Sequence, residues 1–216
     1  GILSRFWVQE LTRPAFEDWM ANEPEPIVII GIGAIEQHGI HLPLGTDSLG
    51  VHEFIHEIAS RTNSVCIHPC WAGFSPHHMA FPGSVTFSAE TLLNILLDTI
   101  ESFAHHGVKR FILINHHGGN TQTMNLAAQI AKRKYKVMIG TPSGPRKTEL
   151  AKKIQDRMAR YFEVHSGPRE TAYALHYFPD LVEMWRLENW ESGVIIPDQL
   201  REYMDPDRED YELVNQ

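Results

Sequence analysis

The sequence predicts an α/β protein built as a three-layer α/β/α sandwich with a mostly parallel central sheet. Four short apolar runs rich in β-branched residues alternate with longer segments of helical periodicity. This alternation is typical of βαβ crossovers, in which helices cover both faces of a parallel sheet. With 216 residues, of which 43% are apolar, the chain is long enough for a single domain, residues 1–216, with a complete core.

The individual elements follow from local signals. Thr12 is a suitable N-cap for a first helix over residues 14–21, with Pro14 in its first turn. Ser88 caps a helix that runs to about residue 105 and carries a continuous apolar stripe. Four further helices are predicted at 47–61, 121–134, 147–160 and 169–177, and the strands at 27–32, 65–68, 110–115 and 136–140.

Composition limits the classes of function. The net charge is -8 and the pI about 5.9, and no basic cluster stands out, so we expect no nucleic-acid partner. No apolar run approaches the roughly 18 residues of a membrane span, so we expect no membrane association. Cys66 and Cys70 form neither a disulfide framework nor a zinc-knuckle spacing; as free thiols they favour a cytoplasmic location.

The segment GIGAIEQHGIHLPLGTD, residues 31–47, could hold either a phosphate or a metal ion. Its Gly31-Ile32-Gly33 start is like that of a dinucleotide-binding loop, but Glu36 replaces the third glycine of that fingerprint. A carboxylate there would repel a pyrophosphate, and the G-K-[ST] of a P-loop is missing. The pattern therefore disfavours a nucleotide.

Metal binding suits the same segment better. Divalent ions bind carboxylate oxygen and imidazole nitrogen, and the segment offers both. Glu36 and His38 are two residues apart, so in an extended chain their side chains point to one side. Pro43 and Gly45 allow the chain to turn back and bring Asp47 close to them.

Two later segments add candidate ligands. The segment HHGGN follows the third strand, and ligands bind beyond the carboxyl ends of parallel strands, so His117 should lie near the first loop. The two glycines that follow His117 permit a close approach. In HSGPRE, Pro168 indicates a helix start, which places His165 in the loop and Glu170 in the first turn. Taken singly, each residue is more readily a hydrogen-bonded loop histidine or a surface glutamate than a metal ligand. Five of them in three loops favour a metal site.

Together these motifs resemble those of the creatininase family of metal-dependent amidohydrolases. GAIEQHGIHLPLGTD, FPGSVTFSAET, NHHGGN and HSGPRET match E-x-H-G-x-H-L-P-x-x-T-D, F-P-G-T, N-x-H-G-G-N and H-x-G-x-x-E-T in that order, from about residue 27 to 182. The resemblance is to the Gly-Gly branch. Creatininase itself has N-G-H-Y-E-N in the third motif, and Gly119 stands here in place of that glutamate. The resemblance implies a creatininase-like α/β/α fold that holds two divalent ions of zinc, manganese or iron.

The resemblance also implies roles for the matching residues. Glu36 and His117 would hold one ion, His38 the other, and Asp47 would bridge them. Glu170 would supply the ligand that Gly119 cannot, and His165 corresponds to the catalytic histidine of the family. Four further residues are candidates for orienting the ligands or lining the substrate pocket: His41, His78, Asn115 and Asn120. His41 is equally suited to a structural turn, and His78 to a simple loop role.

The implied chemistry is hydrolysis of a C–N bond other than a peptide bond. A hydroxide bridged by two ions about 3.5–4 Å apart would attack the carbonyl of an amide, formamide or cyclic amide. His165 would protonate the leaving nitrogen, since imidazole exchanges protons near neutral pH. Glu170 is the alternative proton-transfer group if it is not a ligand. The partner is thus a small-molecule amide or formamide.

Other functions stay open at this point. One is true creatininase, which is disfavoured by Gly119 and because no Trp lies between Gly140 and His165, where the family's creatinine-enclosing tryptophans are found. A second is a peptide-trimming metallohydrolase of cofactor maturation. A third is a non-enzymatic metal-binding subunit. The family resemblance also implies a homo-oligomer, with a hexamer as the expected state.

Overall fold

The computed structural model describes residues 3–142, 148–158 and 165–188, and the chain divides into two compact units. The sheet unit comprises Gly1–Ile35, Asp47–Pro76 and Val85–Pro142, and the loop unit comprises Glu36–Thr46, His77–Ser84 and Ser143–Gln216. Each unit is described by itself. That residues 1–216 form a single domain stays a prediction.

The sheet unit contains four strands that all run parallel: β1 (Ile27–Ile32), β2 (Val65–Ile67), β3 (Arg110–Asn115) and β4 (Met138–Gly140). Their order across the sheet is β2-β1-β3-β4. Ile32 pairs with Asn115, so β1 and β3 end side by side. The chain therefore leaves both strands at the same edge, as the predicted parallel topology requires.

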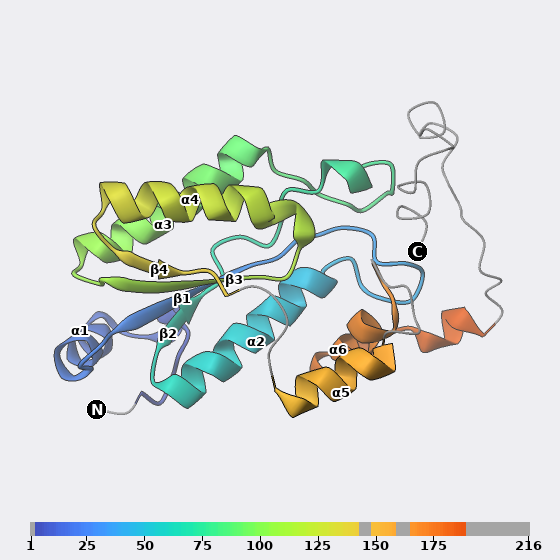
Figure 1. Ribbon diagram of the computed structural model, residues 1–216, viewed down its shortest axis with the longest axis horizontal. Coiled ribbons are helices and arrows are strands. Elements are labelled where there is room, and N and C mark those ends of the chain that lie inside the picture. Colours follow the sequence, from blue (N-terminus) through green and yellow to red (C-terminus); the bar gives the residue numbers. More distant parts are fainter. Residues whose placement is uncertain (1–2, 143–147, 159–164, 189–216) are drawn as a thin grey trace. The chain divides into compact units, whose positions relative to one another are not determined.

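Helices cover both faces of this sheet (Figure 1). The side chains of Val28, Ile30 and Ile32 point to one face, where α3 (Ala89–His105) and α4 (Thr121–Lys134) bury their apolar stripes. Ile29 points to the other face and packs against α2 (Thr46–Thr62). The α/β/α layering predicted from the sequence is confirmed.

The predicted caps and boundaries are close to the observed ones. α1 (Arg13–Asn22) begins after Thr12, whose side chain accepts a hydrogen bond from the backbone N–H of Ala15. Ser88 caps α3 in the same way. Two strands are shorter than predicted: β2 ends at Ile67 instead of residue 68, and β4 begins at Met138 instead of residue 136. Lys136 has a φ of 57°, and this left-handed conformation is incompatible with a strand.

Within the loop unit, two helices accompany the segments that carry the predicted ligands. α5 (Glu149–Met158) corresponds to the predicted helix 147–160, of which residues 147, 159 and 160 lie outside the described part. α6 (Pro168–Tyr177) begins at the predicted proline, and two 3-10 turns follow, η4 (Pro179–Leu181) and η5 (Met184–Leu187). The Glu36 N–H donates to the Leu44 carbonyl and closes the first loop.

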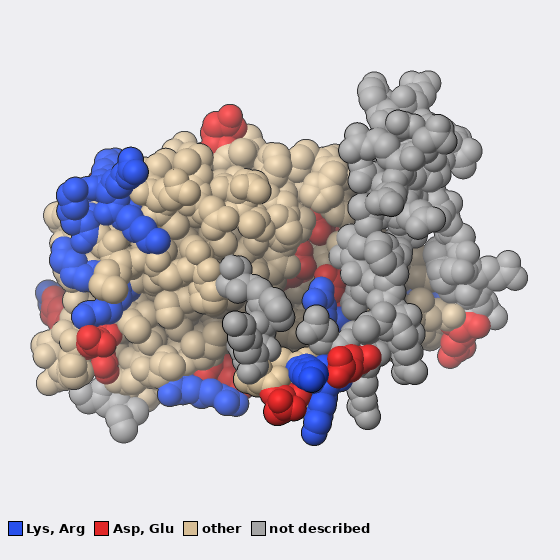
Figure 2. Space-filling model, viewed as in Figure 1, with Lys and Arg blue, Asp and Glu red and all other residues tan. Residues whose placement is uncertain are grey.

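Basic side chains gather at one end of the sheet unit, at the left of Figure 2, near the end of α4 in Figure 1. The last turn of α4 carries Lys132, Arg133 and Lys134, which complement the negative end of the helix dipole. The Lys134 Nζ also lies 3.9 Å from the Glu101 Oε2. The prediction that the chain has no basic cluster is therefore wrong at the last turn of α4. The absence of a nucleic-acid partner stays a prediction.

No helix in the described ranges has the length and apolar character needed to cross a membrane.

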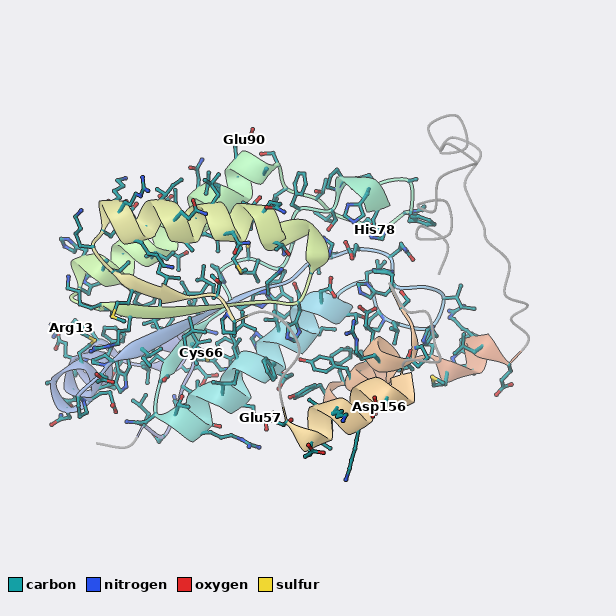
Figure 3. The ribbon with its side chains drawn as sticks, in the orientation of Figure 1. Arg13, Glu57, Cys66, His78, Glu90 and Asp156 are labelled. Atoms are coloured by element: carbon teal, nitrogen blue, oxygen red, sulfur yellow. The ribbon has the colours of Figure 1, made fainter. Side chains whose placement is uncertain are left out.

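Both cysteines of the sheet unit are free thiols. Cys66 is buried in β2 (labelled in Figure 3), and burial raises the pKa of its thiol to about 12. Burial likewise raises the pKa of Cys70 to about 11. Thiols with such pKa values carry almost no thiolate at neutral pH and are poor nucleophiles.

A histidine cluster outside the predicted metal site packs among aromatic rings in the sheet unit. His52 stacks on Trp7 at a centroid distance of 3.9 Å, and His68 lies 4.9 Å from the ring of Trp71. Burial lowers the pKa of His68 to about 4, and nearby His52 and His116 add to this. Neither ring nitrogen of His68 has a hydrogen-bond partner among the described residues. The folded chain therefore keeps this ring neutral.

This burial makes stability depend on pH. The pKa of His68 is about 4 in the folded chain against 6.5 for an ordinary histidine, so the unfolded chain binds more protons between these values. The free energy of unfolding should be highest above pH 6.5 and fall towards pH 4. The contribution of His68 is at most about 3.5 kcal/mol, since a pKa difference of one corresponds to about 1.4 kcal/mol.

The measurement is urea unfolding of the parent and of His68→Phe at several pH values from 4 to 8. The variant should lose part of the decline below pH 6.5. Parallel curves for the two proteins would contradict the assignment to His68.

Candidate metal centre

In the sheet unit, two predicted ligands come together. Asp47 is the second residue of α2, and His117 follows β3 by two residues. Both are buried, and the Asp47 Oδ2 lies 3.2 Å from the His117 Nδ1. Zinc–ligand distances of about 2.0–2.2 Å place two ligands of one ion roughly 3–3.5 Å apart, so this separation suits a shared ion.

The imidazole of His117 is oriented by the main chain. Its Nε2 lies 2.9 Å from the carbonyl oxygen of Phe74, which can only accept, so the Nε2 carries the proton and donates it. In the neutral ring, Nδ1 then presents its lone pair towards Asp47. Metal-ligating histidines commonly have one ring N–H bound to a carbonyl and the other nitrogen on the ion.

Asn115 and Asn120 hold the chain segments on either side of His117. The Asn115 side chain accepts from the His117 N–H and donates to the His117 carbonyl. Asn120 accepts from the Phe74 N–H and donates to the carbonyl of Gly33, both at 2.8 Å. Asn115 thus holds the backbone of His117, and Asn120 holds the backbone of Phe74, whose carbonyl orients the imidazole.

Gly119 has no space for a side chain. A Cβ at this position would lie 2.3 Å from the Phe74 carbonyl oxygen and 2.4 Å from the His117 Nε2. At the preceding Gly118, a Cβ would meet nothing within 4 Å. The hydrogen bond that orients His117 therefore occupies the position from which a glutamate at 119 would have to project.

The loop unit brings together a second group. One ligand atom each of Glu36, His38 and His165 lies within 4.8 Å of the others. Glu36 and His38 are fully buried, and the Glu36 Oε1 lies 3.1 Å from the His165 Nε2. A buried carboxylate beside two imidazoles is a donor set suited to zinc, manganese or iron.

His38 repeats the arrangement of His117. Its Nδ1 lies 3.1 Å from the backbone carbonyl of Glu36 and donates to it, which leaves the Nε2 to bind an ion. The Nε2 lies 3.9 Å from the Glu170 Oε2. Both units thus contain a histidine with one nitrogen on a main-chain carbonyl and the other facing a carboxylate.

His165 and Glu170 are joined through Ser166. The Ser166 N–H donates to the Glu170 Oε2 at 2.6 Å, and its hydroxyl lies 2.9 Å from the His165 Nδ1. Ser166 has a φ of 55°, an uncommon left-handed conformation for a residue other than glycine. Such backbone strain often occurs at functional sites.

His41 and His78 occupy different surroundings in the loop unit. The His41 Nε2 lies 2.8 Å from the Thr171 hydroxyl, which itself donates to the Gly167 carbonyl, so His41 donates to Thr171 and holds the first turn of α6. Burial, with a smaller effect of His38, lowers the pKa of His41. His78 (Figure 3) is buried, with its Nε2 3.6 Å from the Glu36 Oε1.

The predicted residues therefore fall into two sets. The loop unit holds Glu36, His38, His41, His78, His165 and Glu170, and the sheet unit holds Asp47, Asn115, His117 and Asn120. The Ser75 hydroxyl lies 3.2 Å from the His117 Nε2. Sequence reasoning missed this residue and three others that hydrogen-bond to predicted site residues: Gln37, Ser166 and Thr171. Three of these lie next to a predicted functional residue in the chain, and that adjacency was the one available signal.

Fold and ligands together define a class: a parallel α/β protein with buried histidines and carboxylates in its strand-end loops, suited to divalent metal ions. The model of the creatininase (creatinine amidohydrolase) family matches residues 9–212, and the chain belongs to this family.

Three relatives show the range of the family. The chain is 26% identical over 179 residues to 3-dehydro-scyllo-inosose hydrolase of Thermotoga maritima, covering 78% of this chain and 56% of that protein. It is 32% identical over 162 residues to the mycofactocin precursor peptide peptidase of Mycolicibacterium smegmatis, covering 72% and 59%. It is 24% identical over 206 residues to creatinine amidohydrolase of Pseudomonas putida, covering 88% and 79%. The chain thus spans less than two thirds of the first two relatives.

Solved structures agree with the fold. The structure of a manganese creatininase superposes with a TM-score of 0.77 at 24% identity, covering 89% of this chain and 80% of the other. An E122Q mutant creatininase of Zn-Zn type gives a TM-score of 0.75 over the same shares, also at 24% identity. At this identity the likeness establishes the fold.

The crowding at Gly119 can be tested with its neighbour as a matched control. Gly119→Ala should lower the free energy of unfolding by about 1–3 kcal/mol, the usual cost of overpacking, because the methyl group displaces either Phe74 or His117. Gly118→Ala should change it little. Urea unfolding of both variants checks this, and equal stabilities would contradict the crowding.

Proposed function

We propose that this chain is a metal-dependent amidohydrolase that cleaves a C–N bond other than a peptide bond in a small amide, formamide or cyclic amide. The observation that carries the proposal is the paired orientation of His117 and His38. Each donates one ring N–H to a main-chain carbonyl and turns the other nitrogen towards a carboxylate. This arrangement is the one that metal-ligating histidines almost always show.

By correspondence with the motifs of the family, we further propose that the predicted ligands bind two divalent ions. Glu36 and His117 would hold one ion, His38 and Glu170 the other, and Asp47 would bridge them. The support is the motif correspondence with the family and the short chain connection, since Asp47 closes the loop that carries Glu36 and His38. Two solved relatives are a manganese creatininase and a creatininase mutant of Zn-Zn type.

Divalent ions at such ligands would supply a water activated near neutral pH and Lewis-acid polarisation of the substrate carbonyl. The side chains would then have to transfer protons and exclude competing substrates. Family members act on substrates as different as inosose rings and peptides, so the ligand residues set the reaction class, and the surrounding loops set the substrate.

His165 is the residue best placed to transfer a proton. Its Nδ1 faces the Ser166 hydroxyl at 2.9 Å, and its Nε2 faces the Glu36 Oε1 at 3.1 Å. A carboxylate accepts only, so the proton of the neutral ring lies on Nε2, and the Ser166 hydroxyl donates to Nδ1. An imidazole held at both nitrogens keeps one defined proton for the leaving nitrogen of the substrate.

We propose that Glu170 takes over the role of the ligand that creatininase has in its third motif. No side chain fits at position 119, while the Glu170 carboxylate is held by the Ser166 N–H and lies near the His38 Nε2. We propose Glu170 as a ligand first, and as a proton-transfer group only if the centre holds one ion.

A second candidate is a peptide-trimming hydrolase of cofactor maturation. It is favoured by the 32% identity to the mycofactocin precursor peptide peptidase. True creatininase is the weaker alternative, because Gly119 cannot be exchanged for the glutamate without a clash. Turnover of creatinine, a formylated aminopyrimidine and a short peptide would separate the three. The homo-oligomer, the hexamer and the cytoplasmic location stay predictions.

The metal dependence gives a direct prediction. Elemental analysis of the parent should find close to two ions per chain, and Asp47→Ala should lower this to one or fewer. Hydrolysis should fall at least about 100-fold, because a bridging carboxylate serves both ions. Asp98→Ala removes an exposed carboxylate of α3 and should change neither value. Full turnover in a metal-stripped parent would contradict the mechanism.

The role of His165 is separable from that of the ligands. His165→Ala should keep the parent's metal content but lower turnover by about 100- to 10,000-fold, the usual effect of losing a general acid. Glu170→Ala should instead lose metal. His176→Ala, at an exposed site on α6, is the matched control. Loss of metal from His165→Ala would make His165 a ligand, as its place beside Glu36 and His38 also allows.

A further inference from the structure

Gln37 lies between the two loop-unit ligands in the chain, and its side chain makes a defined set of hydrogen bonds. Its Oε1 lies 3.0 Å from the backbone N–H of Gly39, which donates to it. The amide oxygen is therefore on the Gly39 side, and the NH₂ group points the other way. That group lies 3.1 Å from the His78 Nδ1.

This orientation determines the protonation of His78. The NH₂ group of an amide only donates, so the His78 Nδ1 must accept and carries no proton. The proton of the neutral ring is then on Nε2. That nitrogen lies 3.6 Å from the Glu36 Oε1, too far for a hydrogen bond but close enough for a favourable electrostatic contact.

The opposite tautomer would have two adverse effects. With the proton on Nδ1, the Nε2 lone pair would face the Glu36 carboxylate. The same lone pair would also be free to bind a metal ion and to compete with the proposed ligands, because neutral imidazole is a metal ligand through either nitrogen. His78 is buried, so no bulk solvent is available to compensate.

A second contact fixes the same two segments. The Gln37 backbone N–H donates to the Ser84 hydroxyl at 3.1 Å, at the end of the segment that carries His78. That segment is closed by the bonds from the Phe81 N–H to the His78 carbonyl and from the Ser84 N–H to the Phe81 carbonyl. Gln37 thus holds His78 in position and determines which of its ring nitrogens carries the proton.

We propose that Gln37 is a positioning residue that holds His78 in the Nε2–H tautomer, so that His78 presents an N–H to the Glu36 carboxylate and stays out of the metal ligand set. The inference rests on the proposed function for its catalytic consequence. Its structural content, the tautomer of His78, can be measured without a substrate.

The test uses the full-length, zinc-loaded protein with ¹⁵N-labelled histidine. Long-range ¹H–¹⁵N spectra at neutral pH distinguish the two ring nitrogens, and His78→Gln identifies the His78 signals among thirteen histidines. The parent should show protonation on Nε2 alone. In Gln37→Glu, the new carboxylate can only accept, so His78 should carry a proton on Nδ1. Gln37→Met removes the donor and should give a mixture of tautomers.

The functional readouts are zinc affinity and turnover. Both should fall about tenfold or more in Gln37→Glu, in the range seen when residues that orient ligands are changed. Gln129→Glu makes the same charge change at an exposed site on α4 and should alter neither the His78 signals nor the affinity.

The possible failures are distinguishable. Nδ1 protonation in the parent, or unchanged His78 signals in Gln37→Glu, would overturn the role of Gln37 whatever the activity. Failure of the proposed function would appear separately, as a parent that binds no zinc or hydrolyses none of the amides tested while its His78 still shows the Nε2–H tautomer.

Discussion

The site depends on two hydrogen bonds to main-chain carbonyls, from the His117 Nε2 to Phe74 and from the His38 Nδ1 to Glu36. Imidazole has two chemically similar nitrogens, so a histidine in a loop can present either one. A carbonyl at one nitrogen removes this ambiguity, because it accepts and never donates. The remaining nitrogen is then the one that faces a carboxylate in each unit. Both carbonyls belong to loops that other contacts must hold still.

Close packing of backbone segments supplies that rigidity in the sheet unit. A Cβ at Gly33 would lie 2.5 Å from the Cα of Ser48, so glycine allows the end of β1 to approach the start of α2. Gly73 similarly approaches the Gly33 carbonyl and the Asn120 amide. Asn120 forms hydrogen bonds with the Phe74 N–H and with the Gly33 carbonyl. Asp47 and the Phe74 carbonyl are thus fixed by contacts in which little displacement is possible.

The sequence was a good guide where signals are local. The cap at Ser88, the proline at the start of α6 and the apolar run of β1 each depend on neighbours within one turn or strand, and the predicted boundaries were close. The spacing of Glu36 and His38 placed two candidate ligands together for the same reason. The start of β4 was missed because the left-handed conformation of Lys136 has no sequence signal comparable to glycine.

The hydrogen-bonding residues of the site were harder to predict. Whether Gln37 turns its amide nitrogen or oxygen towards a histidine depends on Gly39 and on a loop forty residues away. The conformation of Ser166 depends on the carboxylate four residues later, which captures its N–H. The strand order β2-β1-β3-β4 is also not contained in the alternation of strands and helices, because the same alternation fits several orders.

The closed space at Gly119 limits which residues this position of the chain can accept. A glutamate codon is one base change from some glycine codons, so mutation alone would let position 119 exchange freely between the two residues. The Phe74 carbonyl and the His117 ring block that route, because either would have to move before any side chain fits. Two changes are therefore needed before a glutamate can occupy position 119 in this chain: the substitution itself and a shift of the Phe74 backbone or of the His117 ring.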